Sequence, residues 1–173
     1  SATEKVLNDV VLQLQLQKPA VFKQSFARPN LSFNVRHVQD KVHQLVHILQ
    51  HTSGSAIVYC RNRRRTQEIA NQLQQYGISS SFYHAGISNE QRTLKQDAWM
   101  QNNIRVMVCT NAFGMGINKP DVQVVVHLDV PDCLENYYQE AGRAGRNGAT
   151  AYAILLTNEA DDVYLEQLPD IRY

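Results

Sequence analysis

Two short runs of apolar residues constrain the fold more than any other feature of this sequence. Ala56–Cys60 and Val106–Cys109 contain only apolar residues, as is typical of strands in a parallel sheet whose two faces are both covered by helices. Further strand and helix patterns alternate along the chain. We expect strands at Leu31–His37, Ala56–Cys60, Ser80–His84, Arg105–Cys109, Gln123–Leu128 and Ala151–Leu156. We expect helices at Asp40–His51, Arg64–Tyr76, Ser88–Gln101, Asp132–Arg146 and Asn158–Leu168. This alternation predicts an α/β fold, a three-layer α/β/α sandwich with a mostly parallel central sheet.

Local signals support several of the expected helix ends. Asp132 and Glu135 have the spacing of a capping box, and Gly77 stands where a left-handed residue ends a helix. At the start of the chain, Thr3 can cap one more helix, which we expect to end at Pro19. These signals place most helix boundaries independently of the apolar pattern.

Composition narrows the class of protein. The 173 residues are enough for one domain with a short appendage, and 17 basic against 16 acidic residues leave a net charge of +1. Three widely spaced cysteines, without a Cys-x-x-Cys pair, favour neither a zinc site nor a disulfide framework. No apolar run approaches the roughly 20 residues that span a bilayer. We therefore expect a cytoplasmic protein with no metal ligands of its own and no membrane partner.

In parallel sheets, ligands bind outside the carboxyl ends of the strands, and one segment there stands out. At helical spacing, Gln139, Arg143 and Arg146 share one face, and glycines separate the two arginines. A glycine costs a helix about 1 kcal/mol relative to alanine, so we interpret these glycines as room for two guanidinium groups to converge on a triphosphate. The alternative is a fraying helix end with cations near the negative end of its dipole.

Two further segments follow expected strands. Residues 110–120 carry Gly114 and Gly116, but a Gly-x-Gly pair is weak evidence and a tight loop would explain it equally. Residues 61–65 contain four arginines, a basic patch suited to phosphates, with a solvated edge as the alternative. The chain has neither a Gly-x-x-x-x-Gly-Lys-[Ser/Thr] loop nor an Asp-Glu-x-[Asp/His] box. It thus has arginines placed for a nucleotide without the usual groups that hold the nucleotide and its magnesium.

Taken together, these segments resemble the second RecA-like motor domain of superfamily 2 helicases, in particular the RecQ family of ATP-dependent DNA helicases. Residues 56–63 are similar to helicase motif IV, 108–122 to motif V and 138–148 to motif VI, while 26–30 resemble the junction between the two motor domains. Gln139-Glu140 stands where DEAD-box RNA helicases have His-Arg, which favours RecQ.

The resemblance implies a division of the chain and of the chemistry. Residues 1–24 would be the trailing part of the first motor domain plus linker, and residues 25–173 the second RecA-like domain. ATP with Mg²⁺ would be held mainly by the first domain, so we expect no cofactor on this chain alone and no ATP turnover by it. The implied partners are single-stranded and forked DNA and the first RecA-like domain of the same protein.

The resemblance also implies roles for individual residues. Arg146 is expected to be the arginine finger and Arg143 a second phosphate ligand, with Gln139 coupling the nucleotide to the DNA. Gly114 and Asn118 are expected near the nucleotide. The DNA backbone would be held by Asn62, Arg63, His84, Gly86, Thr110, Gly116 and Lys119, during 3′-to-5′ movement. Two alternatives stay open: a non-catalytic binding module with this fold, and an RNA-directed superfamily 2 helicase.

Overall fold

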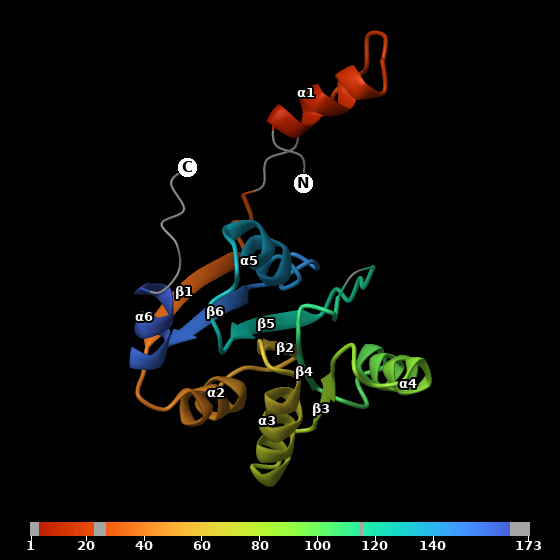
Figure 1. Ribbon diagram of the computed structural model, residues 1–173. Coiled ribbons are helices and arrows are strands. Elements are labelled where there is room, and N and C mark those ends of the chain that lie inside the picture. Colours follow the sequence, from red (N-terminus) through yellow and green to blue (C-terminus); the bar gives the residue numbers. More distant parts are fainter. Residues whose placement is uncertain (1–3, 23–26, 115, 167–173) are drawn as a thin grey trace.

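A parallel sheet of six strands organises the computed structural model, which describes residues 4–22, 27–114 and 116–166 (Figure 1). The strands are β1 (Leu31–His37), β2 (Ser55–Tyr59), β3 (Ser80–Tyr83), β4 (Val106–Cys109), β5 (Val122–His127) and β6 (Ala151–Thr157). They lie in the order β1-β6-β5-β2-β4-β3, and every pairing is parallel. The expected strands are confirmed, with ends that differ by a residue or two.

Helices cover both faces of this sheet. They are α2 (Lys41–Gln50), α3 (Arg63–Gln75), α4 (Asn89–Met100), α5 (Leu134–Ala141) and α6 (Glu159–Glu166). The helix α1 (Glu4–Gln13) precedes β1 and lies apart from the sheet (Figure 1). One apolar cluster joins α2 and α3 to one sheet face, and a second joins Trp99 of α4 and Ala141 of α5 to the other. In Figure 1, α2 and α3 lie on the opposite side of the sheet from α5. The three-layer α/β/α sandwich is confirmed.

The buried strands explain why this arrangement forms. All five residues of β2 and all four of β4 are buried, because alternate side chains enter the two apolar clusters. Trp99 is fully buried against the ring of Phe113, which follows β4, with the ring centroids 5.3 Å apart. The core therefore fixes where β4 ends and where the residues after it begin.

Two expected helix ends are wrong. Helix α5 ends at Ala141 rather than Arg146, and its N-cap is Cys133 with no side-chain capping bond, so Asp132 forms no capping box. Helix α1 ends at Gln13, six residues before Pro19, and Gln15 follows with a positive φ of 49°. Thr3 lies outside the described residues.

One other local signal is confirmed. Gly77 ends α3 with a φ of 74°, as expected. Asp40 caps α2 by accepting bonds from the amides of Val42 and His43, a cap that was not predicted. Helix α1 buries none of its residues. Among the residues that the structure describes, none of the helices combines the length and the apolar character needed to cross a membrane.

Candidate nucleotide and nucleic-acid site

The backbone between α5 and β6 leaves the helix before it reaches the two arginines. We call residues 142–149 the arginine segment. The Gly145 amide donates to the Val122 carbonyl (2.8 Å) instead of to a carbonyl of its own helix, and the φ of Gly145 is 67°. The expectation that Gln139, Arg143 and Arg146 share a helical face is therefore wrong. The arginines are presented by turns, and Gln139 is exposed on α5.

Both arginines are bound to the loop that leads from β4 to β5, residues 110–121, which we call the β4–β5 loop. Arg143 donates from Nη1 to the carbonyl of Gly114. Arg146 donates from Nη1 to the carbonyl of Ile117 (2.9 Å) and to Oδ1 of Asn118 (3.0 Å). The structure thus brings together four residues that the sequence predicted near a nucleotide: Gly114, Asn118, Arg143 and Arg146.

Gly114 is needed for this contact. A Cβ atom at Gly114 would lie 2.6 Å from Nε of Arg143, and the φ of Gly114 is 115°, a conformation that side chains other than glycine rarely adopt. The glycine beside a guanidinium group is thus Gly114 of the β4–β5 loop. The glycines that were predicted to make room for the arginines face other groups, since a Cβ at Gly145 would meet Nδ2 of Asn30 and a Cβ at Gly142 the Tyr138 carbonyl.

Positive charge gathers around Arg146 without a compensating carboxylate. Among the described residues, no ion pair involves Arg28, Arg143 or Arg146. Burial lowers the pKa of Arg146, and the charges of Arg143 and Arg28 lower it further. Three guanidinium groups within electrostatic reach of one another repel unless an anion joins them. Since guanidinium groups bind phosphate through paired hydrogen bonds, this cluster is suited to a phosphate group.

A buried pair beneath the sheet edge holds α5 and was not found from the sequence. Nε2 of His127 lies 2.8 Å from the carboxylate of Glu140, and His127 is 1% exposed. The ring of His127 stacks on Tyr59, with the centroids 5.0 Å apart. A histidine and a glutamate thirteen residues apart carry no recognisable spacing, so no sequence signal pointed to them. The pair ties the end of β5 to the last turn of α5, immediately before the arginine segment.

At the other end of the sheet, the carboxyl ends of β2 and β3 bring together Arg63, His84 and Gly86. The Gly86 amide donates to Nδ1 of His84 (3.1 Å), which leaves the proton of the neutral ring on Nε2. Burial lowers the pKa of His84, and the charges of Arg63 and Lys95 add to this effect. A Cβ at Gly86 would lie 3.6 Å from Nη1 of Arg63. This edge therefore offers two cations and one ring N–H to a phosphate.

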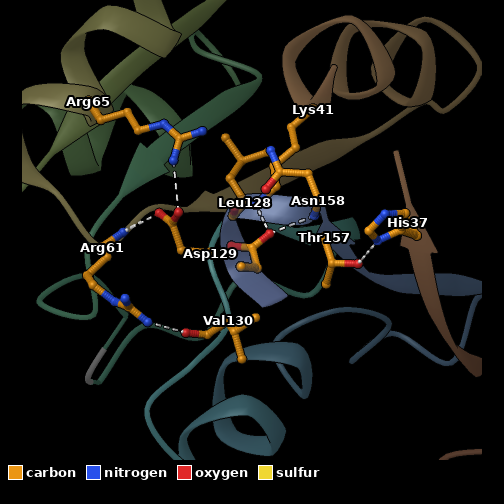
Figure 2. A network of polar contacts seen from close by, with 10 residues as sticks. His37, Lys41, Arg61, Arg65, Leu128, Asp129, Val130, Thr157 and Asn158 are labelled. Atoms are coloured by element: carbon orange, nitrogen blue, oxygen red, sulfur yellow. Dashed lines mark hydrogen bonds and ion pairs between the residues drawn. The ribbon is translucent and has the colours of Figure 1, made fainter. Parts of the chain in front are cut away.

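The remaining arginines of the 61–65 patch serve the protein itself. Asp129 accepts from the amide of Arg61 (2.8 Å) and from Nη1 of Arg65 (2.8 Å), as Figure 2 shows. The Arg61 guanidinium also donates to the Val130 carbonyl (2.7 Å). Arg64 is 89% exposed and pairs with Glu68 one turn along α3. Of these four arginines, Arg63 is the one whose guanidinium makes no hydrogen bond or ion pair with the residues that the structure describes.

Lys119 is placed where it cannot hold DNA. It is 4% exposed, and its ammonium contacts the Met100 carbonyl (3.1 Å), Oδ1 of Asn102 (2.8 Å) and Oδ1 of Asp121 (2.9 Å). Burial raises the pKa of Asp121, but the hydrogen bond and charge of Lys119 outweigh this and hold that pKa below its ordinary value. The prediction that Lys119 contacts the DNA backbone is contradicted, because its ammonium is enclosed and fully bonded.

Three further residues were predicted to contact the DNA backbone: Asn62, Thr110 and Gly116. Asn62 caps α3 with Oδ1, which accepts from the amide of Arg64 (2.8 Å), so only its amide group remains for a ligand. Thr110 is buried, and its hydroxyl accepts from the Ala112 amide (3.4 Å). Gly116 is exposed, with a φ of 75°. These contacts give Asn62 and Thr110 structural roles in the segments that follow β2 and β4.

A cleft of about 90 Å³ opens at the carboxyl ends of β2, β4 and β5. Its lining includes the carboxylates of Asp129, Asp132 and Glu140, whereas Arg143 and Arg146 do not line it. Burial, with a smaller contribution from the Asp129 charge, raises the pKa of Cys60 in its wall to about 12, so this thiol stays protonated at neutral pH. Arg61 also lines this cleft, so its wall carries charges of both signs, and the two arginines expected at the nucleotide lie outside it.

Comparisons with known proteins agree with this geometry. A family model described as the helicase conserved C-terminal domain matches residues 40–148. The ATP-dependent DNA helicase RecQ of Pasteurella multocida is 40% identical over 169 residues, 97% of this chain and 27% of that protein. A protein of Acanthamoeba polyphaga mimivirus, provisionally named an ATP-dependent RNA helicase, is 42% identical over 163 residues, 93% of this chain and 30% of that protein.

The fold comparison points the same way. The Escherichia coli DEAD-box protein SrmB, solved in complex with a regulator of ribonuclease activity, matches with a TM-score of 0.69 and 28% identity, over 78% of this chain and 81% of that chain. The chain spans less than a third of the length of the two curated relatives described above. With its family model, its relatives and its RecA-like sheet in agreement, the chain belongs to the helicase conserved C-terminal domain family, in its RecQ-like form.

Proposed function

We propose that this chain is the C-terminal motor lobe of an ATP-dependent DNA helicase that moves 3′ to 5′ along single-stranded DNA and opens forked duplexes. The observation that carries the proposal is the gathering of Arg28, Arg143 and Arg146 with no carboxylate partner among the described residues. Such a cluster is suited to the charge that develops on a transferring phosphoryl group.

The residues of this chain fit part of an ATP site and not the whole of it. Arg146 would approach the γ-phosphate and Arg143 a neighbouring phosphate oxygen, with Asn118 and Gly114 holding the two side chains. Among the described residues, no group of three or more His, Cys, Asp or Glu side chains could hold a metal ion. Bound ATP with Mg²⁺ supplies the phosphoryl group for hydrolysis. Both would be held mainly by a preceding RecA-like lobe, and this chain alone would not turn over ATP.

The division of the chain follows from the same proposal. Residues 1–24 would belong to the end of the preceding lobe and its linker, and residues 25–173 to the lobe with the arginine cluster. The exposed apolar side chains of α1 support this division, since Val10 and Leu12 are 40% and 74% exposed in a helix without buried residues. An apolar helix face of this kind is suited to packing against another domain.

Strand separation tests the proposal directly. The complete protein that contains this chain is expected to open a tailed DNA duplex with ATP, and to prefer a 3′ single-stranded tail over a 5′ tail. A fluorescence unwinding assay with both tailed duplexes measures this. Unwinding of RNA duplexes in preference to DNA would instead support the RNA-directed alternative, which the name of the mimivirus relative favours. DNA binding without ATP hydrolysis would support a non-catalytic module.

The affinity for single-stranded DNA is expected to depend on Arg63. Arg63→Ala removes one cation beside His84 and Gly86, so single-strand affinity should fall and its logarithmic dependence on salt should flatten by about 0.7, as for one lost phosphate contact. Fluorescence anisotropy at several salt concentrations measures the slope. The matched control is Arg64→Ala, which removes the same charge from a side chain that is 89% exposed and paired with Glu68. Equal slopes for both variants would place Arg63 outside the DNA path.

A further inference from the structure

The loop that enters β1 holds the backbone of the arginine segment. Arg28 lies three residues before β1, and its guanidinium donates to three carbonyls of that segment: Gly142 (3.3 Å), Ala144 (3.0 Å) and Gly145 (2.8 Å). These carbonyls follow the end of α5, where the backbone no longer supplies helical partners. A single side chain more than 110 residues away in sequence therefore satisfies the carbonyls on both sides of Arg143.

Asn30 completes this contact from the same loop. Its side-chain amide donates to the carbonyls of Gly145 (2.8 Å) and Ala149 (2.9 Å), and its own carbonyl accepts from the Ala151 amide (2.8 Å). There is no space for a side chain at Gly145, because a Cβ there would lie 2.6 Å from Nδ2 of Asn30. The Gly145 carbonyl is thus bonded by both Arg28 and Asn30, immediately before Arg146.

We propose that Arg28 and Asn30 are positioning residues that hold the arginine segment in the conformation that presents Arg143 and Arg146 to the nucleotide. This inference rests on the proposed function. The segment contains three glycines, which lose more conformational freedom on ordering than any other residue. The bonds from Arg28 and Asn30 fix its backbone on one side, and the β4–β5 loop holds its two arginine side chains on the other.

Arg28 adds a positive charge beside Arg146, which a side chain that only capped the carbonyls after α5 would not need. A neutral donor would satisfy the same carbonyls without placing a further cation beside Arg146, where like charges repel. A cation there makes the empty site less favourable and an anion-bound site more favourable. The proposed boundary between the lobes also falls within four residues of Arg28. The chain that arrives from the preceding lobe would therefore end on the residues that set the position of the arginines.

Steady-state kinetics of the complete protein test this inference. Arg28→Met is expected to lower the kcat of DNA-stimulated ATP hydrolysis by about 100-fold, the loss that a small misplacement of catalytic groups produces. KM for ATP and single-strand affinity should stay unchanged. Arg28→Lys should recover part of kcat, because an ammonium can reach one or two of the three carbonyls. The matched control is Arg36→Met, which removes an exposed arginine from β1 and should leave kcat unchanged.

A double-mutant cycle separates positioning from general stability. In an Arg146→Ala background, Arg28→Met should cause a smaller loss of kcat than in the wild type, because Arg146, one of the two groups that Arg28 positions, is already absent. Should Arg28→Met fail to fold, Asn30→Ala removes two bonds of the same contact and is expected to show a smaller loss with the same dependence on Arg146.

The outcomes that overturn the inference are distinct from those that overturn the proposed function. Equal losses in both backgrounds, or a parallel fall in DNA affinity and melting temperature, would make the contact merely structural. A full effect of Arg146→Ala with none for Arg28→Met and Asn30→Ala would overturn the positioning role alone. Unchanged hydrolysis by Arg146→Ala would overturn the proposed function, and the positioning role with it.

Discussion

Arg146→Ala in the complete protein is expected to lower DNA-stimulated ATP hydrolysis by about 10³-fold or more, the range that arginine fingers contribute in phosphoryl transfer. Arg146 is held by Ile117 and Asn118 and has no carboxylate partner among the described residues, so its charge is available to a phosphate. A coupled ATPase assay with saturating single-stranded DNA measures the loss. Single-strand affinity should change little, because the proposed DNA contacts lie with Arg63 and His84.

Arg146→Lys tests whether the charge of Arg146 is sufficient or its planar guanidinium is also needed. Lysine keeps the charge but lacks the planar fork that lets one guanidinium bond the loop and a phosphate together. We expect its hydrolysis rate to lie between those of the wild type and Arg146→Ala. The control Arg64→Ala removes a surface arginine from α3 and should retain full hydrolysis. A proportional loss of hydrolysis and DNA affinity in Arg146→Ala would contradict the finger and indicate a structural role.

The largest expected loss of stability comes from Asp161→Ala. Asp161 and Lys41 form an ion pair of 2.6 Å between α6 and the first turn of α2, and their side chains are 12% and 5% exposed. Lys41, which is labelled in Figure 2, also donates to the Leu128 carbonyl (2.5 Å). The Asn158 amide donates to the carboxylate of Asp161 (2.7 Å). Removing the carboxylate leaves a buried ammonium without its counter-charge, which should lower the free energy of unfolding by about 3–5 kcal/mol.

Urea denaturation of the chain, followed by circular dichroism, measures this difference. Glu68→Ala is the matched control, because it breaks the exposed pair with Arg64, where a pair within one helix contributes about 0.3–0.5 kcal/mol. Lys41→Met tests the same site from its other partner and replaces the buried charge with an apolar chain of similar length. If Asp161→Ala and Glu68→Ala had equal effects, the Lys41 ammonium would be solvated in solution rather than buried.

The sheet could be predicted from the sequence because burial on both faces leaves a direct mark. Ala56–Cys60 and Val106–Cys109 are apolar throughout, and as β2 and β4 both have a neighbouring strand on each side. Gly77 likewise follows the end of its helix with a positive φ of 74°, as its residue type predicts. The sequence alone therefore predicts two kinds of feature. One is a feature determined by residues close in sequence, and the other is a strand buried on both faces, where every residue must be apolar.

The end of α5 could not be predicted in this way, because distant residues determine it. The expected helix continued to Arg146, but the Gly142 carbonyl, which the Arg146 amide would bond in a continued helix, accepts from Arg28, and the Gly145 amide donates to the Val122 carbonyl of β5. Lys119 shows the same limit. The resemblance to the helicase family implied a nucleic-acid contact for Lys119, whereas Asn102, seventeen residues away, helps to enclose its ammonium. The sequence thus predicted which residues lie near the site, but it could not predict which groups they contact, because those groups come from distant parts of the chain.

The β4–β5 loop and the arginine segment form a ladder of their own, although neither is a strand. Its rungs run from Arg143 to Gly114, from Arg146 to Ile117 and from the Asn147 amide to Pro120. Inserting or deleting one residue in either segment would shift every rung beyond it. Natural variants of this lobe should therefore keep both segments at constant length and place their insertions in turns elsewhere, such as the one after α3.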